Sequence, residues 1–219
     1  MRFSHDPALL AEFPHLVVAT LTLDGVTSTS DVTATAAPFL ERASARLAER
    51  PESEFPEIAA WRRAFTQLGL KATQYRCASE ALLRRFKKEG ELPSIHPLVD
   101  LCNAVSLAYA IPIAVFDLDK VIGDLTVTRA DGTETYLSFS GATENPEPAE
   151  VIFRDDAGNA HARRWTNRQS ALSAIRPDTR RVLVVSEALH DTAPADVDAL
   201  LADLTTALRQ HWSASRPVD

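Results

Sequence analysis

The polar residues best suited to chemistry in this chain stand near the ends of apolar segments. Amides, guanidinium groups and carboxylates of this kind can bind carboxylate, phosphate or carbonyl oxygens, and they can orient water. The sequence has no Walker loop, GxSxG, GxGxxG or HExxH motif and only seven glycines, which argues against nucleotide hydrolysis and dinucleotide redox chemistry. The candidates are Asn103, Asp117, Arg163, Arg164, Asn167, Arg168, Gln169 and Glu187.

Asn103 falls inside an apolar segment that we expect to be a buried helix. Pro97 suits the first turn of this helix, and Pro112 ends it just before the apolar strand at 113–116. A buried amide without hydrogen bonds costs roughly 1–3 kcal/mol. Asn103 is therefore predicted either to brace a neighbouring loop or to hold a polar ligand. His96 lies seven residues earlier, about two helical turns away, and is either a cap or surface residue or a second catalytic candidate.

Residues 163–169 form the densest group of candidates. Trp165 supplies an apolar anchor among guanidinium and amide groups that recognise oxygen atoms. If the segment is a strand, Arg164 and Arg168 share one face while Trp165 and Asn167 share the other. It is then either a pocket wall or a structural element in which Arg164 or Arg168 pairs with a nearby carboxylate. The possible partners are Asp155, Asp156 and Asp178.

Glu187 directly follows the apolar strand predicted at 181–186. This position puts a carboxylate at the mouth of a buried strand, where it is either solvated or part of a pocket.

The charge distribution separates one basic segment from an acidic remainder. The net charge of −7 argues against broad, nonspecific binding of nucleic acid. Residues 61–88 nevertheless carry eight basic side chains against the single acid Glu80, a local balance of +7. This segregation suits a protein that docks one phosphate-rich end of a polymer, although ordinary solvated helix faces would give the same pattern. The basic residues are Arg62, Arg63, Lys71, Arg76, Arg84, Arg85, Lys87 and Lys88.

The elements that must position these residues predict an α+β fold. Helices are expected at 38–50, 56–68, 79–90, 97–111 and 193–212, and an early strand at 15–22. The period then changes to two, with strands at 113–116, 125–128, 135–139, 149–153 and 181–186. We predict helices of the first half packed on a mainly antiparallel meander of the second half, within a single domain spanning 1–219. The tail from Ser213 is expected to fray.

Composition places further bounds on the protein. Cys77 and Cys102 are too few for a disulfide framework and form no zinc motif, so both are predicted to be buried thiols. No apolar run approaches the roughly 20 residues needed to cross a bilayer, and the N-terminus lacks a signal-peptide core. We therefore expect a cytoplasmic protein without membrane or DNA partners.

A set of motifs in fixed order resembles a known family. LPSIHPLVDLCN precedes PIAVFDLDKVIG, with WRRAFTQLGLKATQYRCASEALLRR upstream and AEVIFRDDAGNAHARRWTNRQS and PDTRRVLVVSE downstream. This order resembles the editing (B-three/B-four) domain of the phenylalanyl-tRNA synthetase beta subunit over residues 55–190, and it looks most like the free-standing members of that family. The resemblance implies hydrolysis of mischarged aminoacyl-tRNA.

The resemblance also implies roles for individual residues. Asn103 matches the asparagine of the family's editing pocket, and Glu187 stands where a glutamate lines that pocket. Ala114 stands where the family has a pocket histidine, which His96 could replace. The segment at 163–169 departs from the family's Gly-rich stretch, so the amino acid need not be tyrosine. The substrate-binding residues implied in this way are Ala114, Asp117, Arg164, Trp165, Asn167 and Arg168.

Three functions follow as hypotheses. The first is a trans-editing aminoacyl-tRNA deacylase that acts on tyrosyl-tRNA for phenylalanine or canavanyl-tRNA for arginine. Because the ester is already activated, this reaction requires neither nucleophile, metal nor cofactor. The second is a noncatalytic module that binds tRNA or an amino acid, and the third is a small-molecule hydrolase indifferent to tRNA.

Overall fold

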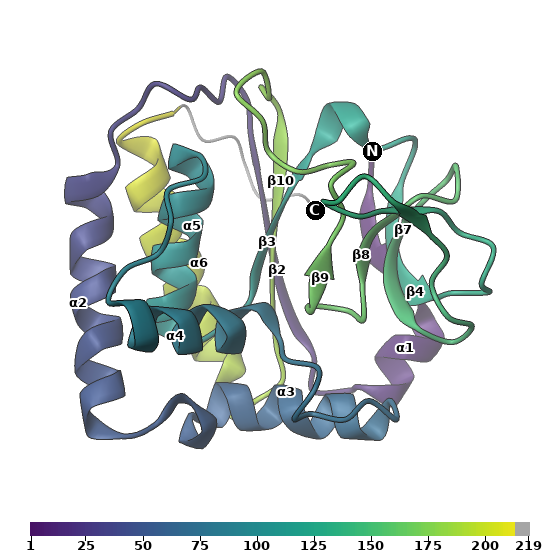
Figure 1. Ribbon diagram of the computed structural model, residues 1–219, viewed down its shortest axis with the longest axis horizontal. Coiled ribbons are helices and arrows are strands. Elements are labelled where there is room, and N and C mark those ends of the chain that lie inside the picture. The colour runs from purple at the N-terminus through teal and green to yellow at the C-terminus, as the bar shows by residue number, and fades with distance from the viewer. Residues whose placement is uncertain (213–219) are drawn as a thin grey trace.

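The computed structural model describes residues 1–212 as helices and sheets arranged in layers (Figure 1). A three-stranded sheet stands between a layer of helices and a five-stranded sheet. The helices are α1 (Pro7–Glu12), α2 (Thr33–Glu49), α3 (Pro56–Gln67), α4 (Ala78–Glu89), α5 (Pro97–Tyr109) and α6 (Ala193–Arg209), with short 3-10 helices at Glu52–Glu54 and Leu118–Lys120.

The structure confirms the predicted α+β class, with most helices in the first half of the chain and most strands in the second. The five-stranded sheet has the order β1 (Phe3–His5), β4 (Leu125–Arg129), β7 (Val151–Asp155), β8 (Ala160–Arg163), β9 (Arg168–Gln169). The three-stranded sheet has the order β2 (Val17–Leu23), β10 (Val182–Ala188), β3 (Ile113–Asp117). The short strands β5 (Tyr136–Leu137) and β6 (Thr143–Glu144) pair with each other.

Strand β10 is the centre of the structure because both of its faces are buried. Its side chains alternate between two cores, as the period of a strand requires. Val182 and Val184 pack in the core shared with α5 and α6. Leu183 and Val185 pack on the other side, in the core shared with the five-stranded sheet and α3. A carboxylate on this strand therefore enters the interior of the protein.

Local sequence explains where several helices begin and end. Pro97 occupies the first turn of α5, and α5 ends at Ala110, whose φ of 58° turns the chain toward Pro112. Gly90, with a φ of 79°, ends α4 in the left-handed conformation that glycine adopts at low cost. Trp61 of α3 is 1% exposed and packs in the core.

Several predicted boundaries are wrong. Helix α2 begins at Thr33, so Pro38 lies inside it rather than at its start. Helix α4 begins at Ala78 rather than at 79, and its N-cap residue is Cys77. Helix α6 ends at Arg209 rather than at 212, and the predicted fraying from Ser213 lies outside the described residues.

The predicted meander is wrong in its connections. β10 pairs antiparallel with both β2 and β3, and β1 lies parallel beside β4. Residues 163–169 are not one strand, since β8 ends at Arg163, a turn follows, and β9 begins at Arg168. Pairing between distant strands depends on tertiary contacts that local periodicity does not encode.

Both cysteines are buried free thiols, as predicted. Burial raises the pKa of Cys77 to about 11 and that of Cys102 to about 12, so neither is a thiolate at neutral pH. Within residues 1–212, no helix is both long enough and apolar enough to cross a membrane.

The position of β10 between two cores predicts a large cost for shortening its side chains. Leu183→Ala should lower the free energy of unfolding by about 2–5 kcal/mol, because Leu183 is fully buried. Leu10→Ala removes the same atoms from a residue that is 41% exposed and should change stability little. Denaturant unfolding of the two variants measures both effects, and equal losses would contradict this description of the core.

Candidate functional site

A small cavity lies where the two main sheets meet. Strand β3 forms the edge of one sheet and β9 the edge of the other, and the Gln169 side chain joins them by donating to the Val115 carbonyl at 2.6 Å. The cavity has a volume of about 60 Å³, and its wall is largely apolar. Six residues predicted from the sequence contribute to that wall: Ala114, Trp165, Asn167, Arg168, Gln169 and Glu187.

Glu187 is the buried charged group of this cavity. It is 2% exposed, and its Oε1 accepts hydrogen bonds from Trp165 Nε1 at 2.9 Å and His5 Nε2 at 2.7 Å. A carboxylate taken out of water needs such donors, because an unpaired buried charge is strongly unfavourable. Oε2 has no hydrogen-bond partner within residues 1–212 and is not sealed from solvent. Glu187 thus has one oxygen held by the protein and one oxygen free.

His5 was not predicted from the sequence. It reaches Glu187 from β1, 182 residues away in the chain. The short segment around it has no periodic pattern long enough to indicate a strand, and nothing local indicates that this strand lies beside β4. The imidazole next to the candidate carboxylate is therefore His5 and not His96.

Trp165 reaches Glu187 from a turn of unusual backbone conformation. Arg164 and Trp165 have φ values of 48° and 58°, in the left-handed region that non-glycine residues rarely occupy. The turn is held by hydrogen bonds from Trp165 N to the Val151 carbonyl at 2.7 Å and from Arg164 N to Glu150 Oε1 at 2.9 Å. The indole ring also packs edge-to-face on Trp61 and Phe13. These contacts fix the direction of the indole N–H.

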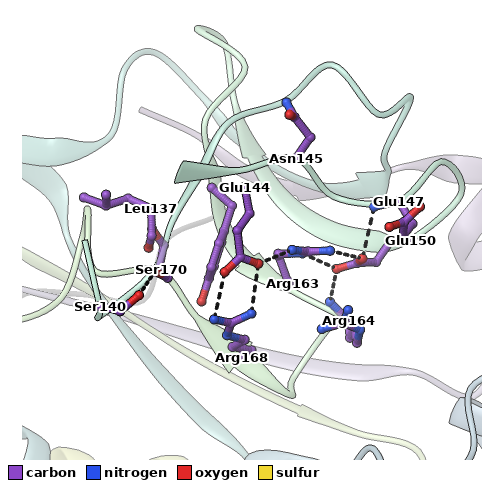
Figure 2. A network of polar contacts seen from close by, with 12 residues as sticks. Leu137, Ser140, Glu144, Asn145, Glu147, Glu150, Arg163, Arg164, Arg168 and Ser170 are labelled. Atoms are coloured by element: carbon purple, nitrogen blue, oxygen red, sulfur yellow. Dashed lines mark hydrogen bonds and ion pairs between the residues drawn. The ribbon is translucent and has the colours of Figure 1, made fainter. Parts of the chain in front are cut away.

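An ion-pair network supports the same turn (Figure 2). The buried guanidinium of Arg163 donates to both oxygens of Glu150 at 2.9 and 2.8 Å and to Glu144 at 2.7 Å. Arg168 donates through two nitrogens to Glu144 at 3.0 and 3.1 Å. Burial alone would raise the pKa of Glu150, but the hydrogen bonds and charge of Arg163 outweigh it and hold that pKa below its ordinary value. Glu150 is therefore ionised at neutral pH.

The predicted carboxylate partners of Arg164 and Arg168 are wrong. Asp155 instead accepts hydrogen bonds within its own loop and from His161, while Asp156 accepts from the Asp124 N–H. Arg168 pairs with Glu144, and the guanidinium of Arg164 lies 4.7 Å above the ring of Tyr75.

Five predicted residues lie outside the wall of the cavity: Arg163 and Arg164, described above, and Asn103, His96 and Asp117. Asn103 is half-buried on α5 rather than buried, and its side chain makes no hydrogen bond within residues 1–212. His96 caps α5 by accepting from the Leu98 N–H at 3.2 Å, and burial lowers its pKa. Asp117 accepts from Thr179 Oγ1 at 2.6 Å. The structure does not bring these residues to Glu187, so their catalytic or binding roles stay predictions.

The basic segment carries less free charge than its sequence indicated. Buried Glu80 pairs with Arg62 at 2.6 Å and Arg76 at 3.4 Å, and buried Glu52 pairs with Arg84 and Lys87. Arg85 pairs with Glu89. The predicted residues without an ion pair in the described part of the chain are Arg63, Lys71 and Lys88.

Two other features bear on where chemistry can occur. A second cavity of about 440 Å³ is lined by Phe13, which packs on Trp165. Its wall also includes Arg63, one of the predicted basic residues.

A serine–histidine–aspartate series lies elsewhere in the interior. His161 is hydrogen-bonded to Ser173 at 2.8 Å and to Asp155 at 3.1 Å. All three are buried, and none of them lines either of these two cavities. Within residues 1–212, no cluster of His, Cys, Asp and Glu could hold a metal ion.

Comparison with known proteins identifies related sequences and a related fold. The family model of the B3/4 domain matches residues 60–202. The phenylalanine–tRNA ligase beta subunit of Bradyrhizobium diazoefficiens is 40% identical over 79 residues, which is 36% of this chain and 10% of that protein. The beta subunit of Chromobacterium violaceum is 31% identical over 88 residues, 40% of this chain and 11% of that protein. The chain thus matches about a tenth of the length of these relatives.

A solved structure shows the same fold at low sequence identity. It is an N-terminal fragment of the phenylalanyl-tRNA synthetase beta subunit from Pyrococcus horikoshii, with a TM-score of 0.53 and 11% identity. The similarity covers 95% of this chain and 48% of that fragment.

The Arg163–Glu150 pair predicts a pH-dependent effect on stability. Glu150→Gln should lower the free energy of unfolding by about 3 kcal/mol at neutral pH, because it leaves a buried guanidinium underpaired. The pKa of Glu150 in the folded protein lies below its ordinary value. The ionised Glu150 therefore contributes its full stability at pH values above the ordinary pKa, and this stability is lost as the pH falls through the folded-state pKa. The difference between the two proteins should therefore shrink on acidification below about pH 4.

Denaturant unfolding at a series of pH values measures this difference. Glu147→Gln is the matched control, since Glu147 is exposed and its carboxylate makes no hydrogen bond or ion pair within residues 1–212. A deficit for Glu150→Gln that stays constant from neutral pH to pH 3 would contradict the assignment of an ionised, paired Glu150.

Proposed function

The chain belongs to the B3/4 domain family, and from this membership together with the cavity at Glu187 we propose that it is a trans-editing aminoacyl-tRNA deacylase. The observation that carries the proposal is the buried Glu187 carboxylate with one oxygen held and one oxygen free. A hydrolase of activated esters needs a fixed acceptor for a water proton, and Glu187 Oε2 meets that requirement.

The reaction demands little of the protein. Water attacks the ester carbonyl that joins the amino acid to the terminal ribose, and a site that positions this water can suffice. Glu187 Oε2 orients the water or binds the ammonium group of the amino acid. Ala114 lies on edge strand β3, whose peptide groups border the cavity and can bind the ester. Asn103 does not line the cavity, so this proposal assigns it no part in the step.

The mouth of the cavity is suited to a terminal phosphate. Ala78, the first residue of α4, lies in the cavity wall, so the N-terminal end of this helix is near the site. Arg168 lies in the same wall, and Arg164 stands next to Trp165 on the turn. The basic segment, residues 61–88, runs from α3 into α4 and would meet the acceptor stem of tRNA.

The family resemblance suggests which amino acid is esterified to the tRNA substrate. Tyrosyl-tRNA for phenylalanine and canavanyl-tRNA for arginine are the two candidates. The cavity of about 60 Å³ is far smaller than the roughly 300–1,000 Å³ of pockets that enclose a whole ligand, so it fits the reacting groups and not a whole aromatic side chain. The side chain would then be accommodated by movement at the wall or outside the cavity.

A noncatalytic module that binds tRNA or an amino acid is the alternative. The observation in its favour is Ala114, a methyl group in the wall where the resemblance implies an imidazole. Such a module would bind charged tRNA without shortening the lifetime of its ester.

Deacylation of a panel of charged tRNAs tests the proposal. The protein should release amino acid selectively from tyrosyl-tRNA for phenylalanine or canavanyl-tRNA for arginine. Glu187→Gln should slow this release on the order of 100-fold, because the amide cannot accept the water proton. Glu147→Gln, at an exposed site, should leave the rate unchanged. Decay of every ester at the rate without protein would contradict the deacylase proposal and favour the binding module.

Binding of uncharged tRNA tests the phosphate contact separately. Arg164→Ala should weaken binding and reduce the slope of log affinity against log salt by about one, as expected for one lost phosphate contact. Arg176→Ala is the control, since Arg176 is exposed and outside the cavity wall. Equal salt slopes for wild type and Arg164→Ala would exclude this contact.

A further inference from the structure

His5 belongs to a part of the chain outside the family match, which begins at residue 60. It is nevertheless held firmly at the site. Strand β1 pairs with β4 so that His5 lies opposite Val127, and the following Asp6 N–H donates to the Val127 carbonyl at 2.9 Å. The Asp6 carboxylate caps α1 by accepting from the Ala8 N–H at 2.8 Å. The imidazole is therefore anchored from both the strand before it and the helix after it.

The hydrogen bond to Glu187 determines the tautomer of His5. A carboxylate that takes a proton from water, as the proposed reaction requires, only accepts hydrogen bonds, and this role places the proton on His5 Nε2. Oε1 of Glu187 then receives two N–H groups, one from His5 and one from Trp165, that come from opposite ends of the chain. Two donors on one oxygen fix the rotation of the carboxylate and leave Oε2 as its free acceptor.

We propose that His5 is a positioning residue for the deacylase reaction, which it serves by fixing Glu187 with Oε2 free to accept a proton from the attacking water. The inference rests on the proposed function and adds to it a group contributed by the N-terminal segment. His5 itself does not contact the ester, because it is absent from the cavity wall.

The reaction step balances without a further reactant. The water oxygen bonds to the ester carbonyl carbon while one water proton passes to Glu187 Oε2. The bond between the carbonyl carbon and the ribose oxygen then breaks, and the proton passes from Glu187 to that ribose oxygen. The products are the free amino acid and uncharged tRNA, and His5 keeps its Nε2 proton throughout.

Two substitutions at position 5 distinguish positioning from a structural role. His5→Ala removes the donor, whereas His5→Gln carries an amide N–H at nearly the place of His5 Nε2. We expect His5→Ala to lower kcat about 10–100-fold with little change in KM, as for other residues that orient a reacting group. His5→Gln should recover most of that loss. His15→Ala, at an exposed histidine of the larger cavity, is the control.

A measurement that needs no activity accompanies the kinetics. Long-range proton–nitrogen NMR spectra of the full chain should show His5 with its proton on Nε2, and His5→Ala should shift the indole N–H resonance of Trp165. Loss of both signatures in Glu187→Gln would support the proposal.

The outcomes separate the two proposals. If no tRNA is deacylated but the NMR signatures are present, the deacylase function fails while the contact of His5 with Glu187 stands, without a catalytic role. If wild type deacylates and His5→Ala matches its kcat, or if His5→Gln is as impaired as His5→Ala, the positioning role is overturned. A fall in thermal stability with unchanged kcat in the folded fraction would make His5 merely structural.

Discussion

The burial of one carboxylate constrains the whole arrangement. Glu187 sits on a strand with two buried faces, where an ionised group without donors would be strongly unfavourable. The two donors that stabilise it, Trp165 and His5, lie far away in the chain. Bringing them together requires the two sheets to meet at β10, and that meeting creates the small cavity beside the free oxygen.

Two features of the fold place the donors of Glu187. The parallel pairing of β1 with β4 places His5, and the left-handed turn after β8 places the indole of Trp165. A backbone conformation of that kind persists only where neighbouring contacts over-determine it. The ion pairs of Arg163 with Glu144 and Glu150 are among those contacts, so this network helps to hold the Trp165 indole in place.

Local sequence predicted the parts of this structure that depend on local physics. Proline at the first turn indicated the start of α5, and the apolar run before Glu187 indicated a buried strand, although β10 continues through Glu187 to Ala188. The role of His5 had no local signal, because it depends on strand pairing across the chain. The ion-pair partners were also mispredicted, since Asp155 is engaged by its own loop, and Glu80 and Glu52 neutralise cations far from them in sequence.

The location of the aminoacyl group is the central claim, and one measurement tests it most directly. A crystal structure of the protein with a nonhydrolysable aminoacyl-adenosine, in which an amide replaces the ester, would show where the reacting carbonyl lies. We expect this carbonyl at the cavity between β3 and β9, with Glu187 Oε2 within reach of a water on it. A ligand bound only in the larger cavity beside Arg63 would contradict the account.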